Sequence, residues 1–319
     1  MALERLLDWV AEPRAPHHAL GWVRRARRYG GLTKPPDLRE PVKLALSFDV
    51  EEDLLRPPDH ARCETCFPFL AWLEATAAPR GWRTTLFVQG SIVPSIAESL
   101  RRLAPGHEIG LHGYYHELWG RRLWFADYPA APPVAVRRQL IARGIAAFEK
   151  AGLPRPTVFR APNLVCDRAT LELLEESGFW LDSSAAAYRG AEPFVSRWGR
   201  LTRVPVTAVP EPTIRRWRGA VPSWAGYRVM NLQTFLAPDL DELIALVERV
   251  LAAQVAVSTP PHVVVLAHPW EFAEWWLPGC TTANYERVVA RVDELSRRLP
   301  IVLSSVGDIA AAATHVSAA

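Results

Sequence analysis

Two histidines spaced four residues apart form the first candidate for chemistry. His112 and His116 lie in "EIGLHGYYHELW", directly after a short alternating apolar run. A tight loop or one helical turn can bring such a pair onto one face, and two neutral imidazoles with one carboxylate make an open zinc site. Surface or capping roles also explain an isolated pair, so its assignment depends on the rest of the chain.

Other residues that could do chemistry share one feature, which is that each stands at the end of an apolar run. They are Asp49, Glu51, Glu52 and Asp53 after "LALSF", Arg160 in "FRAPN", Asp182 in "FWLDSS" and His268 in "VVVLAHPWEF". Packing explains neither four carboxylates nor a histidine at such ends. The guanidinium of Arg160 could hold a carboxylate through two parallel hydrogen bonds.

Repeated β-α units would bring these run ends together. β-branched runs predict strands at 43–50, 84–90, 108–113, 157–162, 179–184, 200–206, 263–270 and 300–305. Helical period predicts helices near 66–78, 92–104, 134–151, 167–177, 239–255 and 284–298. About eight parallel strands are enough to close a barrel, whose carboxyl-terminal strand ends would collect the active site. We therefore expect one α/β domain at 41–312.

Three segments stand apart from this alternation. Residues 1–40 form a basic amphipathic extension, which could rest on an anionic membrane or pack on the barrel as a solvated helix. Residues 185–232 form an insertion rich in Trp, Pro and Arg, and residues 118–133 are also rich in aromatics. Their aromatic side chains could stack on sugar rings or simply seal long loops.

Composition limits the classes of protein and partner. The chain has 319 residues, of which 49% are hydrophobic, with a formal charge of +3, so it is globular and nucleic acid is not favoured as a partner. We expect a cytoplasmic protein, because no secretory signal or membrane-spanning run is evident. The pair Cys63 and Cys66 is interpreted as ordinary thiols, with a redox or metal role as the alternative.

The ordered set of motifs resembles the polysaccharide deacetylases, the NodB-like enzymes of carbohydrate esterase family 4. The resemblance rests on His112-x-x-x-His116, on Arg160-x-Pro162 after a strand and on Leu266-x-His268, and it covers residues 42–310. It implies a distorted (β/α) barrel of about seven to eight strands, related to the TIM barrel. It also implies that the two histidines bind a divalent metal.

The resemblance implies a role for each matching residue. Asp49 matches the base that takes a proton from the attacking water, and Arg160 matches the arginine that holds this base. His268 matches the acid that protonates the leaving amine, and Asp182 matches the carboxylate that orients this histidine. The side chains predicted to contact the substrate are Leu266 near the acyl methyl pocket, Tyr114, Trp270 and Pro162.

One position departs from the family pattern. Members usually carry two adjacent aspartates in the first motif, the second being a metal ligand, but Val50 stands there in this chain. Members with an Asp-x-Asp or Asp-x-Glu form take the ligand one residue further on, so Glu51 is the expected third ligand, with Glu52 and Asp53 as alternatives. Glu51 would share a strand face with Asp49. Val50 could instead mean a weakened or absent metal site.

The resulting prediction is a metal-dependent amide hydrolase. It would remove an N-acetyl group from an amino sugar in a glycan precursor, glycolipid or polysaccharide intermediate. The expected metal is Zn²⁺, with Co²⁺, Ni²⁺ or Fe²⁺ acceptable to the same ligands. Two alternatives stay open: a deformylase or hydrolase of small or cyclic amides, and an inactive barrel that binds carbohydrate. A binding module needs no acid and base pair, which weighs against the last.

Overall fold

The structure is a computed structural model that describes residues 36–53, 63–120, 130–184, 194–211, 226–274 and 277–316. The extension expected at 1–40 therefore lies outside the described residues up to residue 35, and its membrane contact stays a prediction. The insertion expected at 185–232 is described only at 194–211 and 226–232. The stretch at 118–133 is described at its two ends.

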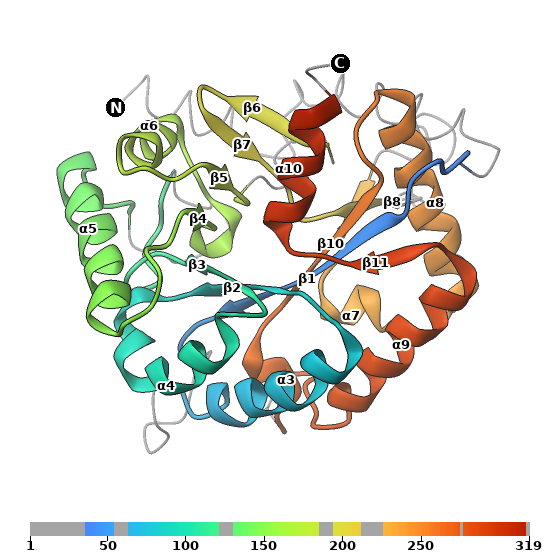
Figure 1. The fold of residues 1–319 in the computed structure, drawn as a ribbon, viewed down its shortest axis with the longest axis horizontal. Helices are drawn as coiled ribbons and strands as arrows, with labels where there is room; N and C mark the ends of the chain where they lie inside the picture. The colour runs from blue at the N-terminus through green and yellow to red at the C-terminus, as the bar shows by residue number, and fades with distance from the viewer. Residues whose placement is uncertain are drawn as a thin grey trace.

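A curled sheet forms the centre of the described fold (Figure 1). Its strands follow the order β10-β1-β2-β3-β4-β5-β7-β6, and β11 pairs with the start of β1. All pairs are parallel except that of β6 with β7. The strands are β1 (Val42–Val50), β2 (Thr85–Val88), β3 (Glu108–Leu111), β4 (Val158–Phe159), β5 (Leu181–Asp182), β6 (Ser196–Trp198), β7 (Leu201–Arg203), β10 (His262–Ala267) and β11 (Ile301–Leu303).

Hydrogen bonds link the segment after β7 to β10 and so draw the two sides of the sheet together. The backbone amide of Thr207 donates to the carbonyl of Val264 at 3.0 Å, and the amide of Val264 donates to the Thr207 hydroxyl at 2.8 Å. The amide of Leu266 donates to the carbonyl of Met230. A separate antiparallel pair is formed by β8 (Ala208–Glu211) and β9 (Gly226–Val229). The predicted distorted (β/α) barrel is thereby confirmed.

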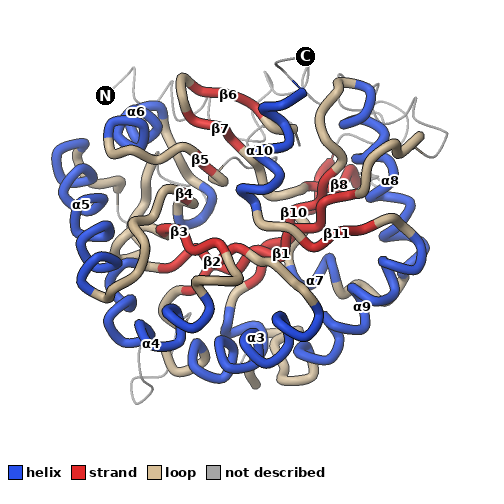
Figure 2. The backbone as a smooth tube through the Cα atoms, viewed as in Figure 1, coloured by secondary structure: helices blue, strands red, loops and turns tan. Residues whose placement is uncertain are grey.

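Helices surround the strands, as Figure 2 shows. They are α3 (Cys66–Arg80), α4 (Val93–Leu103), α5 (Val134–Lys150), α6 (Arg168–Glu176), α7 (Leu232–Phe235), α8 (Leu240–Ala256), α9 (Asn284–Arg298) and α10 (Val306–Val316). The six predicted helices are confirmed. Local chemistry sets their ends: the Asp167 carboxylate caps α6 by accepting from the Thr170 amide at 2.8 Å, and Asp239 caps α8 in the same way. The sequence did not predict α7, α10, β6, β8 or β9.

The helix α10 covers the amino-terminal ends of the strands. Its first residues bind β2 and β3, because the Val306 amide donates to the Thr85 hydroxyl and the Gly307 amide donates to the Glu108 carboxylate. A compact cluster of buried residues joins α10 to the barrel strands; it comprises Ala45, Phe87, Val158, Leu181, Val204, Val264, Val306, Ile309 and Ala310. The opposite, carboxyl-terminal end of the barrel is therefore the one available for a site.

The cysteines are free thiols in the structure. Cys63 and Cys66 are both buried, and the Cys66 thiol lies 3.4 Å from the backbone carbonyl of Glu51. Burial raises the pKa of the Cys66 thiol well above its usual value. This environment favours the prediction of ordinary thiols. Among the described helices, none combines the length and the apolar character that crossing a bilayer requires.

Candidate metal centre and active site

Four strand ends supply the candidate site. The strand β1 leads into Glu51, β3 into His112, β4 into Arg160 and β10 into His268. These strands pair in parallel, directly or through β2, so their carboxyl ends meet at one end of the barrel. That end is the one opposite α10, and it is where a β/α barrel collects functional side chains.

Glu51, His112 and His116 form a cluster that could hold a metal ion. Their ligand atoms all lie within 4.8 Å of one another. One carboxylate oxygen, Oε2 of Glu51, lies 3.1 Å from Nε2 of His112 and 3.0 Å from Nε2 of His116. Burial alone would raise the pKa of Glu51, but the charge of His116 and hydrogen bonds from both histidines lower it well below its usual value. This donor set fits Zn²⁺ with an open position.

Neighbouring groups fix the orientation of the two imidazoles. The backbone carbonyl of Arg160 lies 3.0 Å from Nδ1 of His112. Because a carbonyl only accepts, Nδ1 donates to it, and this hydrogen bond holds the ring with Nε2 toward Glu51. The loop then turns through left-handed backbone at Gly113 (φ 65°) and His116 (φ 64°). A Cβ at Gly113 would lie 2.8 Å from Nε1 of Trp119, so a glycine is required there.

The two alternative carboxylates are bound outside this cluster. Glu52 accepts a hydrogen bond from Nε2 of Gln89 at 2.8 Å. Asp53 accepts from the hydroxyl and from the backbone amide of Thr65. The geometry therefore favours Glu51 over Glu52 and Asp53 as the third ligand.

Asp49 and Arg160 form a buried ion pair beside the cluster. Nη1 of Arg160 donates to Oδ1 of Asp49 at 2.8 Å, and Arg160 is fully buried. Nη2 of the same guanidinium donates to the Ser183 hydroxyl at 2.9 Å, and the guanidinium carbon lies 4.2 Å from the ring centroid of Phe87. The second oxygen of Asp49, Oδ2, lies 3.8 Å from Nε2 of His112. One oxygen of Asp49 is thus anchored while the other faces the cluster.

His268 lies on the other side of the cluster. Its Nε2 is 3.9 Å from Oε1 of Glu51, and its Nδ1 is 3.0 Å from Oε2 of Glu271. The imidazole stacks on Trp270, with ring centroids 4.6 Å apart. Burial would lower the pKa of His268, but the hydrogen bond to Glu271 and the charges of Glu51, Glu271 and Asp49 raise it to about 9. His268 is therefore protonated at neutral pH.

The carboxylate that holds His268 is Glu271, and the prediction of Asp182 for this position is wrong. Asp182 is fully buried and accepts from Nε of Arg203 at 2.8 Å and from the backbone amide of Ser184 at 3.0 Å. The neighbouring strand β7 supplies Arg203, so pairing across the sheet determines the partner of Asp182.

The sequence contained a signal for Glu271 that the motif comparison did not use. Glu271 follows His268 by three residues in "HPWEF", with a proline directly after the histidine. The segment Pro269–Phe272 folds as a short 3₁₀ helix, and the Glu271 carboxylate accepts from the backbone amide of His268 at 2.8 Å. A Glu three residues after the cap position whose carboxylate accepts from the cap amide is one half of a capping box, which a sequence pattern can indicate.

A cavity of about 630 Å³ opens over the metal centre. Of the four predicted substrate contacts, Leu266 and Trp270 line it, and Asn163, Asn231 and Gln233 add neutral polar groups to its wall. The indole Nε1 of Trp270 is buried and has no hydrogen-bond partner within the described part of the chain.

The structure does not place the other two predicted substrate contacts in the cavity wall. Pro162 is buried at the start of the 3₁₀ turn Pro162–Leu164, and the following Asn163 and Leu164 line the cavity instead. Tyr114 lies in a different depression beside Arg143. Its ring packs against Gly90, since a Cβ on that glycine would lie 2.7 Å from the ring.

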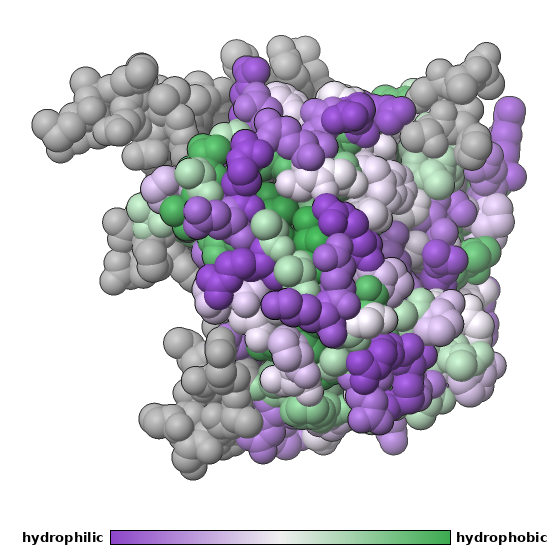
Figure 3. All heavy atoms as spheres, turned by 60° about the vertical axis from the view of Figure 1, so that its left-hand side comes forward, coloured by the Kyte–Doolittle hydropathy of each residue, from purple (hydrophilic) through white to green (hydrophobic). Residues whose placement is uncertain are grey.

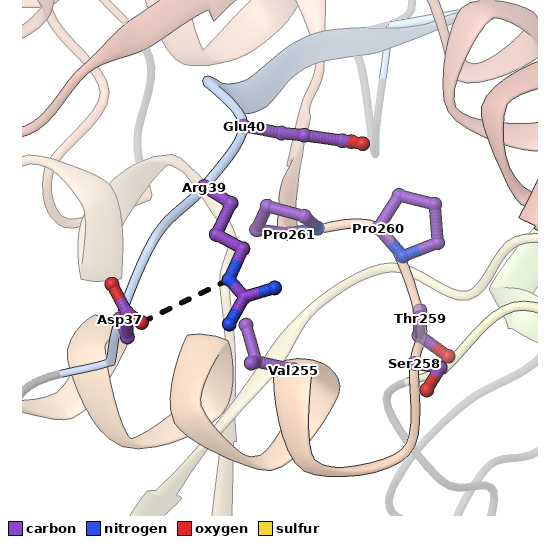
Figure 4. Close-up of a pocket in the computed structure, with 8 residues that line it drawn as sticks. All are labelled: Asp37, Arg39, Glu40, Val255, Ser258, Thr259, Pro260 and Pro261. Atoms are coloured by element: carbon purple, nitrogen blue, oxygen red, sulfur yellow. Dashed lines mark ion pairs between the residues drawn. The ribbon is translucent and has the colours of Figure 1, made fainter.

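A further cavity, of about 380 Å³, lies near the amino-terminal end of β1 and is drawn in Figure 4. The residues that line it are Asp37, Arg39, Glu40, Val255, Ser258, Thr259, Pro260 and Pro261. The ion pair drawn there joins Arg39 to Asp37 at 3.9 Å, and both side chains are nearly fully exposed. Such a pair is weak and screened by solvent. This cavity gathers neither a metal-binding set nor an acid and base pair.

Comparison with known proteins agrees with the predicted resemblance. Residues 68–180 match the family model described as polysaccharide deacetylase, a segment that includes His112, His116 and Arg160. Among curated proteins, none matches the chain. The resemblance to the polysaccharide deacetylases is thereby confirmed.

Solved structures are similar in fold. A putative polysaccharide deacetylase from Mycobacterium smegmatis is 22% identical, with a TM-score of 0.57, over 90% of this chain and 94% of that one. A family 4 carbohydrate esterase from Streptomyces lividans, in complex with acetate, is 15% identical over 83% and 91% of the two chains, with a TM-score of 0.41. A family 4 pseudoenzyme from Bacillus anthracis is 11% identical over 86% and 66%, with a TM-score of 0.46. At 22% identity, the likeness to the Mycobacterium smegmatis structure supports the fold alone.

Proposed function

We propose that this chain, which resembles the polysaccharide deacetylases, is a metal-dependent hydrolase that removes the N-acetyl group of an amino sugar. The proposed substrate is a glycan precursor, a glycolipid or a polysaccharide intermediate. Support comes from the family match over residues 68–180 and from the grouping of the predicted site residues around one cavity. The location proposed from the sequence is the cytoplasm, where residues 1–40 would either pack on the barrel or contact the inner face of the membrane.

Glu51, His112 and His116 would hold the metal. A divalent cation bound there supplies Lewis-acid polarisation of the acyl oxygen and lowers the pKa of a water molecule. The chain prepares these ligands by burying Glu51 and by fixing the tautomer of His112 through the Arg160 carbonyl. Zn²⁺ is the proposed metal, since two nitrogens and one oxygen suit it.

Asp49 is the proposed general base. Its Oδ1 is anchored by Arg160, which leaves Oδ2 free to accept the proton of the attacking water. Arg160 is itself held by the Ser183 hydroxyl and by the face of Phe87, so the carboxylate cannot rotate away from the cluster. A base positioned in this way contributes roughly two to four orders of magnitude to the rate.

His268 is the proposed general acid. It carries its proton at neutral pH because the neighbouring carboxylates raise its pKa to about 9 against the effect of burial. Glu271 holds Nδ1, which directs Nε2 and its proton toward the cavity, where the amine nitrogen leaves. Leu266 and Trp270 form apolar wall beside this position and exclude water from it.

One observation carries the proposal: a base and an acid flank the same metal-binding set from two sides. Oδ2 of Asp49 lies 3.8 Å from Nε2 of His112, and Nε2 of His268 lies 3.9 Å from Oε1 of Glu51. Amide hydrolysis needs a base for the water, an acid for the amine and a hold on the carbonyl oxygen. Asp49 would supply the base and His268 the acid, and a metal on the Glu51, His112 and His116 cluster would hold the carbonyl oxygen.

The test combines metal content with product release. The wild type, Glu51→Ala and His112→Ala are purified without added metal, and metal is measured by mass spectrometry. We expect about one equivalent in the wild type and a loss in both variants. Acetate and formate release are then measured on N-acetyl and N-formyl amino sugars after loading with Zn²⁺.

The outcomes separate the alternatives. Acetate release that depends on Glu51 and His112 supports the proposal. Formate release alone would move the assignment to a deformylase. No metal under any loading condition would make the inactive carbohydrate-binding barrel the better interpretation.

A further inference from the structure

The depression that holds Tyr114 lies between α4 and α5, two neighbouring helices in Figure 1, and we call it the α4–α5 groove. It has a volume of about 650 Å³ and is lined by Pro94, Ala97, Arg101, Tyr114, Arg143, Ala146, Ala147, Lys150 and Ala151. Tyr114 belongs to the loop whose His112 and His116 line the active-site cavity. The groove and the cavity therefore lie on two sides of one loop.

Three cations face the groove without a carboxylate partner in the part of the chain that the structure describes. Nη1 of Arg101 donates to the backbone carbonyl of Ala151 at 2.8 Å, and Nη2 of Arg143 donates to the Tyr115 hydroxyl at 2.7 Å. No ion pair joins Lys150 to a described carboxylate. Their positive charge is thus uncompensated by the described groove wall, which contains no acidic residue.

Other arginines on the same two helices do form ion pairs with carboxylates. Arg102, next to Arg101, binds Glu74 and Glu98, and Arg138 on α5 binds Glu176 at 2.5 Å. The uncompensated cations are therefore not a general property of these two helices. They are confined to the side that faces the groove.

The arginine at the centre is held in place by aromatic rings. The Arg143 guanidinium carbon lies 4.3 Å from the ring centroid of Tyr114 and 5.1 Å from that of Tyr115. Tyr114 is itself packed tightly, since a Cβ on Gly90 would meet its ring at 2.7 Å. A stacked guanidinium with five N–H donors, of which Tyr115 takes one, is oriented in advance for a multidentate anion.

The floor of the groove lets an anion approach closely. Four alanines and one proline leave it without long side chains. Figure 3, which brings this side of the molecule forward, shows hydrophilic side chains interspersed with apolar ones. Three cations around a small apolar floor suit a compact group with more than one negative charge better than they suit a single carboxylate.

We propose that the α4–α5 groove binds a phosphate-type dianion, either free or carried by a sugar, with Arg101, Arg143 and Lys150 as its ligands. The proposal is independent of hydrolysis, because anion binding is measured without turnover. A protein without deacetylase activity could still bind the anion in this groove. A protein that does not bind the anion could still be a deacetylase.

The test is calorimetric titration of the full chain with inorganic phosphate at matched metal content. We expect one saturable site in the wild type. Affinity should fall about tenfold or more in Arg143→Gln and in Lys150→Gln, because each removes a charged donor. The matched control is Arg138→Gln, which removes the same charge from the same helix at a paired and exposed position and should bind within about twofold of the wild type.

Three outcomes would overturn the proposal. They are no saturable binding in the wild type, unchanged binding in both Arg143→Gln and Lys150→Gln, and an equal loss in Arg138→Gln. Arg143→Lys, which keeps the charge without the planar fork, is the second variant if Arg143→Gln does not fold, and it should bind more weakly than the wild type.

A second titration identifies the source of the anion. N-acetylglucosamine 1-phosphate is compared with inorganic phosphate. Tighter binding of the sugar phosphate, lost in Arg143→Gln, would assign the groove to a phosphorylated substrate. Equal affinities would assign it to the free anion.

Discussion

Two ion pairs flank the candidate metal centre, and they are built in opposite order. In the first, the carboxylate of Asp49 faces the centre and the cation of Arg160 lies behind it. In the second, the imidazole of His268 faces the centre and the carboxylate of Glu271 lies behind it. The group in front is the one that can exchange a proton with a substrate.

The difference shows how an ion pair can support a general base in one orientation and a general acid in the other. The guanidinium behind Asp49 donates to one carboxylate oxygen, Oδ1, and so leaves Oδ2 to accept a proton. A carboxylate behind His268 favours the protonated imidazole, which donates one. The base is also the more deeply buried of the two, because the Asp49 side chain is 5% exposed whereas the His268 side chain is 20% exposed. Breaking each pair should therefore affect the protein in a different way.

The largest expected effect comes from removing the front group of either pair. We expect Asp49→Asn and His268→Gln each to lower kcat by roughly two to four orders of magnitude while metal content stays at the wild-type level. Acetate release and metal mass spectrometry measure the two quantities. Glu52→Gln is the control, since Glu52 is bound to Gln89, and it should retain activity. Loss of metal in His268→Gln would show that His268 is a ligand rather than an acid.

Removing the cation behind the base should cost the most stability. Arg160→Met leaves a buried carboxylate unpaired, so we expect the free energy of unfolding to fall by about 3–5 kcal/mol. Denaturant unfolding followed by circular dichroism measures it. Breaking the exposed pair with Arg138→Gln should cost about 0–1 kcal/mol. Equal losses in the two variants would contradict the prediction, because they would mean that burial does not increase the contribution of the Arg160 ion pair to stability.

Removing the carboxylate behind the acid should move a pH profile. Glu271→Gln takes away the main support for the raised pKa of His268, so that pKa should fall from about 9 toward 6.5. The imidazole then loses its proton at lower pH, and the alkaline limb of the kcat profile moves down in pH. At pH 8 this lowers kcat about tenfold for a pKa near 7. An unmoved alkaline limb would exclude His268 as the acid.

The smallest effect on catalysis is expected from Asp182. Asp182→Asn should leave the alkaline limb where it is, because Asp182 binds Arg203 and not His268. The free energy of unfolding should fall by roughly 1–3 kcal/mol, since a buried hydrogen-bonded charge is lost. The pH–rate profile and a denaturant titration check the two parts. A shift as large as that of Glu271→Gln would restore the role that the sequence suggested for Asp182.

The barrel could be predicted because its strands are distinct in composition. The run that forms β1 is apolar and β-branched, and each predicted strand overlaps an observed one. Strands β6, β8 and β9 were missed because they are short and lie in a segment rich in Trp, Pro and Arg, where periodicity is weak. Helix α10 was missed for a different reason: its Ala-rich run after a strand has few polar positions that would reveal a helical face.

The site could be predicted where a residue directly ends a strand. Asp49, Glu51, His112, Arg160 and His268 are placed by the parallel sheet, so their positions follow from the chain. Contacts beyond them depend on side-chain direction, which a single sequence does not specify.

The wrong assignments illustrate that limit. Tyr114 lies only two residues from both histidines, yet the loop turns it toward Arg143. Glu271 was missed because its role depends on a 3₁₀ turn that follows the strand.

The alternation of side chains around Val50 affects how this chain is scored by a sequence motif. Val50 is completely buried and belongs to the hydrophobic core, while the residues on either side of it, Asp49 and Glu51, face the metal centre. A motif search that demands adjacent aspartates would count this chain as missing a ligand. A carboxylate nevertheless lies within 3.1 Å of both imidazoles. The absence of adjacent aspartates therefore does not show that this chain lacks a carboxylate beside its two histidines.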